Sequence, residues 1–128
     1  MTESIKTAIN AYYAEYMRYP ADERTGVVFS NTDLGFLNMM LGTNSPVGNP
    51  RQISFLEVPP KFTNSQGLVT PASFYSKGVR TNFSVMIDTQ GTGALNITVG
   101  SKRYSNSASV AVWVSDPRDS NRPVGTFK

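Results

Sequence analysis

The stretch ESIKTAINAYYAEYM, residues 3–17, decides how the N-terminal part of this chain folds. Its apolar side chains recur at intervals of three and four residues, at Ile5, Ala8, Ile9, Tyr12, Tyr13, Tyr16 and Met17. These intervals place them on one stripe of an α-helix. We predict an amphipathic helix over residues 3–18, with Thr2 as the candidate N-cap and Pro20 ending it. The stripe would pack on a sheet of the same domain or, alternatively, against a partner helix.

A second, short helix is predicted over residues 32–41. The polar run Asn31-Thr32-Asp33 supplies capping side chains, and Gly42 is a typical helix stop. Residues 43–50 are rich in turn-forming residues, and residues 53–58 fit either a helical turn or a strand. Residues 61–80 show no clear period, and we expect an extended loop there.

The second half of the chain has strand composition at residues 83–88, 94–99 and 110–115. Residues 89–93 form a loop of hairpin length, and residues 100–109 read as a longer polar connection. Both faces of residues 110–114 are apolar, so we expect them to form the central strand. Trp113 in that strand fits a core position or, alternatively, a sugar-stacking platform.

Together these elements predict an α+β fold in one domain over residues 1–128. A long N-terminal helix and a short second helix would pack on a three- to four-stranded antiparallel sheet. We expect this sheet to be a β-meander over about residues 83–127.

Composition excludes several classes of chemistry. The 128-residue chain contains no His and no Cys, which removes thiol nucleophiles, disulfides, Cys/His zinc sites and Ser-His-Asp relays. We therefore expect no enzyme. The net charge is +3, and residues 61–128 carry eight Lys or Arg against three Asp. These cations are scattered and match no nucleic-acid-binding motif, so nucleic acid is not an expected partner.

Carboxylates are scarce in the second half, and two of them, Asp116 and Asp119, lie close together in the segment DPRDSN. The segment has strong turn chemistry, and Asx-type hydrogen bonds are the expected role of both side chains. A calcium site is the second interpretation, because two carboxylates and Asn121 are suitable ligands. Catalysis by a carboxylate pair is the third.

Several segments together resemble the G-type pseudopilins of type II secretion systems, which are pilin-like proteins. The resemblance lies in the helix from Ile5 to Tyr13 followed by Tyr19-Pro20, in the NPRQISFLEV segment at residues 49–58, in the strand at residues 83–89, and in the VAVWVS strand at residues 110–115. The family's DPWG-type segment is replaced here by residues 75–83. Its paired glycines and second Asp after the last strand are also absent, so Asp119 alone matches its calcium site.

The resemblance implies a structural subunit that polymerises into a periplasmic fibre. Its partners would be other pseudopilin subunits and secretion-system components. It would be anchored in the inner membrane by a hydrophobic helix preceding Met1, with this domain on the periplasmic side. No cofactor is implied except calcium, with Asp119 as candidate ligand. The alternative function is a stand-alone envelope module that binds glycan or protein through Trp113 and the tyrosines.

Overall fold

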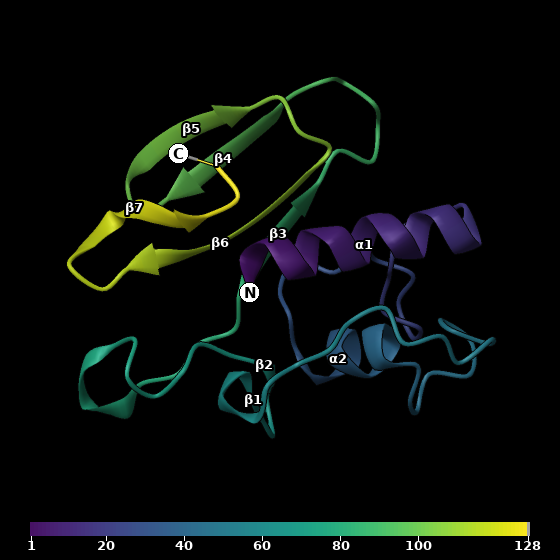
Figure 1. Cartoon of the computed structure of the whole chain (residues 1–128). Coiled ribbons are helices and arrows are strands. Elements are labelled where there is room, and N and C mark those ends of the chain that lie inside the picture. Colours follow the sequence, from purple (N-terminus) through teal and green to yellow (C-terminus); the bar gives the residue numbers. More distant parts are fainter. Residues whose placement is uncertain (128) are drawn as a thin grey trace.

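A computed structural model describes residues 1–127, which form an α+β arrangement of helices and antiparallel strands. Figure 1 shows the strands that follow residue 83 on one side, helix α1 (Thr2–Tyr16) along their inner face, and helix α2 (Leu34–Leu41) beyond α1. The N-terminal helix is thus covered on two sides. In the described residues, no helix has the length and hydropathy needed to span a bilayer.

Helix α1 confirms the predicted stripe over its first three turns. Ile5, Ala8, Ile9 and Tyr12 are all buried. The predicted ends need correction. Met1, not Thr2, occupies the N-cap position and no side chain caps this end. At the other end, Met17 adopts a left-handed conformation with φ 56° and its N–H donates to Tyr13 O. The helix therefore stops before Pro20 is reached, and Met17 is 74% exposed at the end of the stripe.

Helix α2 is fixed by the capping residues at its two ends. The Asp33 side chain accepts a hydrogen bond from Phe36 N at 2.9 Å, and Gly42 ends the helix with φ 75°. This confirms the capping chemistry, although the helix begins at Leu34 and not at Thr32. Its inner face buries Phe36, Met39 and Met40 against α1 and the loops around it.

The main sheet has three antiparallel strands in the order β3 (Ser84–Ile87), β6 (Val110–Asp116) and β7 (Asp119–Gly125). The central position predicted for residues 110–114 is confirmed. A separate antiparallel pair joins β4 (Leu95–Val99) to β5 (Lys102–Asn106).

This topology differs from the predicted meander. Strand β3 pairs with β6 and not with the next strand along the chain, so residues 89–93 do not close a hairpin between paired strands. Residues 100–109, predicted as a polar connection, contain strand β5. That strand escaped prediction because it lies at the edge of a two-stranded pair with most of its side chains exposed, and so lacks apolar alternation.

The first half and the middle of the chain contain little further regular structure. Residues 53–58 form neither the helical turn nor the strand considered for them. Residues 61–80 are irregular except for a short ladder between β1 (Thr63–Asn64) and β2 (Gly67–Leu68), and 3₁₀ turns at Pro60–Phe62 and Ser76–Gly78.

Strand β6 separates two hydrophobic clusters, which explains why both of its faces are apolar. Val110, Val112 and Val114 face the larger cluster, which includes the buried side of α1 and the inner face of α2. Ala111 and Trp113 face the smaller cluster, beneath β4 and β5. Alternate residues of a strand point to opposite faces, so one strand serves both cores.

Candidate functional site

The last turns of α1 are attached to the loop that follows α2 by tyrosine hydroxyls. Tyr12 OH donates to Gly48 O, and Tyr16 OH donates to Asn49 Oδ1 at 2.5 Å. The two rings lie 4.8 Å apart, and both meet Phe55 edge-on. Burial raises the pKa of Tyr12, so its phenol stays protonated and remains a donor. The loop thereby fixes the direction of the helix.

Asn49 is the centre of this loop. Its side chain is fully buried, and its Nδ2 donates to Met39 O at 2.8 Å and to Ile53 O at 2.7 Å. Its Oδ1 accepts from Ile53 N as well as from Tyr16. One side chain therefore ties α1, α2 and residues 49–53 together. This role belongs to the Asn-Pro-Arg segment that carries part of the family resemblance.

A surface carboxylate supports the same loop from the other side. Glu23 Oε1 accepts from the Ser45 hydroxyl at 2.5 Å and from Gly48 N at 2.7 Å. These hydrogen bonds, that from Ser45 first, lower the pKa of Glu23 below its ordinary value. The ionised carboxylate is the form that the loop binds.

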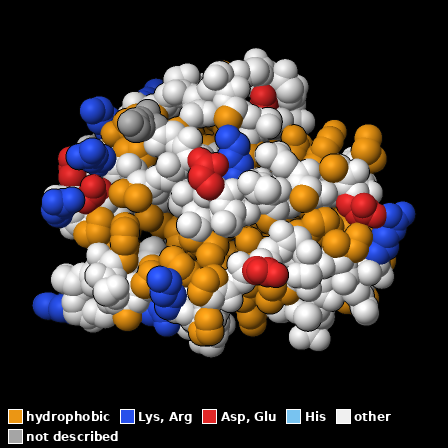
Figure 2. All heavy atoms as spheres, in the orientation of Figure 1, with side chains coloured by type: hydrophobic (Ala, Val, Ile, Leu, Met, Phe, Trp, Pro, Cys, Tyr) orange, Lys and Arg blue, Asp and Glu red, His pale blue; other side chains and the backbone are white. Residues whose placement is uncertain are grey.

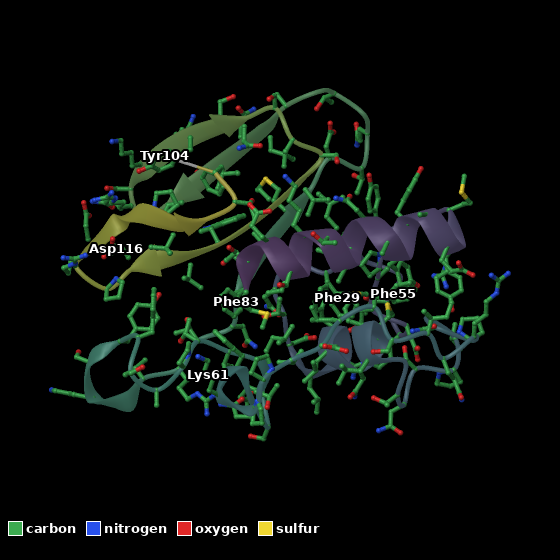
Figure 3. The ribbon with its side chains drawn as sticks, viewed as in Figure 1. Phe29, Phe55, Lys61, Phe83, Tyr104 and Asp116 are labelled. Atoms are coloured by element: carbon green, nitrogen blue, oxygen red, sulfur yellow. The ribbon has the colours of Figure 1, made fainter. Side chains whose placement is uncertain are left out.

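The turn between β6 and β7 brings together the two carboxylates singled out from the sequence. Asp116 Oδ1 accepts from Arg118 N at 2.8 Å, and Asp119 Oδ1 accepts from Asn121 N at 3.0 Å. Both are Asx-type turns, as the first interpretation of this segment predicted. Asp116 and Asp119 line a surface cavity of about 510 Å³ together with Lys102, Tyr104 and Arg122, among others. Figure 3 labels Tyr104 and Asp116 at this end of the sheets.

The donor set of this cavity does not fit calcium. Asn121 Oδ1 accepts from the backbone N and hydroxyl of Ser101, so this oxygen is already engaged. Lys102 and Arg122 add positive charge to the same walls. Among the described residues, no group of three or more Asp and Glu side chains is placed to hold a metal ion. Calcium at Asp119 is thus supported by the resemblance alone and not by the lining of this cavity.

Trp113 belongs to the core. It is 9% exposed, and its ring meets Phe127 edge-on with centroids 5.6 Å apart. A sugar-stacking platform needs an exposed ring face, so the second interpretation of Trp113 is wrong.

A second hollow, of about 230 Å³ and almost wholly apolar, lies beside the first turn of α1. Its walls include Met1, Phe62, Phe74, Phe83 and Val114. Sequence reasoning missed this hollow because Phe62 and Phe74 lie in the stretch that shows no period. It missed the role of Asn49 for a different reason: the hydrogen bonds of its side chain to Tyr16 and Met39 join segments that only folding brings together.

Comparison with known proteins adds no relative. No family model, no curated protein and no solved structure matches this chain.

Proposed function

We propose that this domain is a pseudopilin-like structural subunit of a type II secretion or type IV pilus-like assembly, which acts by polymerising into a periplasmic fibre. The observation that carries the proposal is the way in which α1 packs against the sheet. The first element of the chain is an amphipathic helix that lies along the central strand of an antiparallel sheet, with Ile5, Ala8, Ile9 and Tyr12 buried beneath it. This arrangement suits a helix that carries a globular coat domain, the pilin-like form that the sequence resemblance implies.

The network around Asn49 supports a mechanical role. In a fibre, a load applied along α1 would pass to the rest of the domain through the core contacts and through the hydroxyls of Tyr12 and Tyr16. Buried, fully hydrogen-bonded networks make such a junction rigid. Subunits would meet through different surfaces on each copy, since repeated heterologous contacts generate an open helical filament.

The partners and location follow from the same proposal. Other pseudopilin subunits and secretion-system components would contact this domain on the periplasmic side of the inner membrane. A hydrophobic helix continuing α1 upstream would hold the subunit in that membrane before assembly. The fibre requires no enzymatic step and no cofactor.

The gene upstream of the Met1 codon tests this proposal. We expect a short basic leader, a processing site and about 20 apolar residues in frame with α1. A stop codon directly upstream, in a gene whose product is made without such a segment, would overturn it.

A stand-alone envelope binding module is the second candidate, favoured by the cavity at the β6–β7 turn. Tyr104, Lys102 and Arg122 offer an aromatic face and two cations on its walls. This function predicts measurable binding of an anionic or polar glycan by the isolated domain. Titration with acidic oligosaccharides followed by calorimetry tests it, and loss of heat in Tyr104→Ala would locate the ligand in this cavity.

A further inference from the structure

The hollow beside the first turn of α1 is apolar and open at the surface. Its lining includes Phe62, Pro71, Phe74, Phe83, Val114 and Val124, of which Val124 is 37% exposed. The loop leading away from it carries a further apolar side chain, since Val79 is 51% exposed. Phe83 and Val114 form a buried floor, and the exposed Val79 and Val124 add apolar contact area at the surface, a combination found at interaction sites.

The segment between Glu57 and Asp88, which contributes much of the lining of the hollow, carries only basic charged side chains. Residues 58–87 contain Lys61, Lys77 and Arg80 but no Asp or Glu. Lys61 Nζ lies 5.4 Å from the centroid of the Phe62 ring. Arg80 donates to the carbonyls of Lys61, Thr63 and Thr70, and is held at the rim. Lys77 is exposed on the loop.

Figure 2 shows the face that contains α1. An apolar band crosses it between the sheets and the lower part of the molecule, with Lys and Arg side chains at the lower left and Asp or Glu side chains elsewhere along the band. Figure 3 places Lys61 below Phe83, on the lower side of the band. Three carboxylates lie near these residues in the sequence: Glu3, next to the lining residue Thr2, Glu57, four residues before Lys61, and Asp116, which pairs with Arg118.

We propose that this surface, defined as the hollow together with Lys61 and residues 71–80, docks on the surface of an anionic phospholipid bilayer. Aromatic and aliphatic side chains flanked by Lys and Arg match the interface, where apolar groups enter the acyl boundary and cations meet lipid phosphates. Complementary charge selects an anionic amphiphile over a neutral one. The surface lies at the start of α1, so under the proposed function it would face the membrane in which the upstream helix is anchored.

The experiment is co-sedimentation of the 128-residue chain with vesicles. One set contains phosphatidylglycerol and phosphatidylcholine in equal parts, and the other contains phosphatidylcholine alone. We expect at least about tenfold stronger binding to the anionic vesicles, with the preference falling as salt is raised. Absence of binding to anionic vesicles at low salt would overturn the proposal. An acidic protein would then be the alternative partner for this surface.

Paired variants separate this surface from net charge. Lys61→Gln with Lys77→Gln removes two cations from the rim, and we expect binding to fall about tenfold. Arg24→Gln with Arg103→Gln removes the same charge from two exposed positions outside this surface and should leave most of the binding intact. Circular dichroism of each variant checks folding. Val79→Ser removes an exposed apolar side chain without changing the net charge, and we expect it to weaken vesicle binding. If both double variants lose the same amount of vesicle binding, the binding depends only on net charge, which would contradict the proposal.

The outcome is independent of the upstream gene. If the chain binds vesicles but its gene encodes no membrane helix, the docking surface is supported and the proposed function is refuted. A membrane helix in the gene with no vesicle binding by this domain would do the reverse.

Discussion

Tyr16, in the last turn of α1, donates its hydroxyl hydrogen to the side-chain oxygen of Asn49, 33 positions further along the chain. The same oxygen accepts from Ile53 N, and the amide nitrogen of Asn49 serves two carbonyls. One buried side chain thus satisfies the backbone of a loop and holds the end of a helix.

Asn49→Ala is expected to destabilise the domain by about 3 kcal/mol, because it leaves buried carbonyls and N–H groups without partners. Tyr16→Phe removes the donor to Asn49 and the acceptor of the exposed Arg51 N–H, and should cost about 1 kcal/mol. Urea unfolding followed by circular dichroism measures both. Asn10→Ala, on the exposed side of α1, is the matched control and should be close to neutral. A cost for Asn49→Ala no larger than that of the control would refute the role given to this side chain.

Gly42→Ala should be the more damaging of two glycine substitutions at left-handed positions. A Cβ at Gly42, where φ is 75°, would meet the backbone of Gln52 and Ile53 at 2.7–2.9 Å. Gly26 has φ 71° and open space around its Cα. We expect about 1 kcal/mol for Gly26→Ala from backbone conformation alone, and about 3 kcal/mol for Gly42→Ala, which adds the collision. Thermal and urea unfolding of the two variants would show whether the crowding matters.

The sequence predicts elements whose pattern is local, and the two helices are the clearest case. The stripe from Ile5 to Tyr12 and the Asp33 cap need only the spacing of neighbouring residues. Met17 continues the same stripe in sequence but lies in solvent, because the chain leaves the helical conformation at that residue. Hydrophobic periodicity does not indicate the residue at which a helix ends in a left-handed conformation.

Of the sheet topology, only the central position of β6 could be predicted, because both faces of that strand are apolar. Val110, Val112 and Trp113 identify a central strand, but nothing local states that β3 joins β6 across an inserted hairpin. The candidate site divides in the same way. The Asx turns at Asp116 and Asp119 follow from turn chemistry, whereas the hollow beside α1 depends on segments brought together only by folding.

Acid should weaken the loop around Glu23 in a defined direction. The pKa of Glu23 is lower in the folded domain than in the unfolded chain, so its stabilising contribution is present above the ordinary Glu pKa. It is lost as the pH falls through the lowered pKa of the folded state. Glu23→Gln should flatten the fall in unfolding free energy between about pH 5 and pH 3, and Ser45→Ala should flatten it in part. Urea titrations at each pH test this, and parallel curves for all three proteins would contradict it.

Fluorescence reports on the smaller hydrophobic cluster, because Trp113 is the single tryptophan. We expect blue-shifted emission and weak quenching by acrylamide in the native domain. Phe127→Ala should open a cavity beside the indole and increase quenching, at a cost of about 3–5 kcal/mol. Tyr13→Ala, at an exposed position of α1, is the control. Strong quenching in the unmodified protein would place Trp113 at the surface and restore it as a binding platform.

Calcium should leave the stability of this domain unchanged. The Asp116 and Asp119 carboxylates accept backbone N–H groups across the β6–β7 turn, and Lys102 and Arg122 oppose a cation in the cavity beside them. Any ion that binds only the folded state would raise the melting temperature with its concentration. We therefore expect equal melting temperatures in millimolar calcium and in chelator, for the native chain and for Asp119→Asn alike. A rise in calcium that Asp119→Asn abolishes would place a metal at this turn, and the assembly proposed here would then depend on that ion.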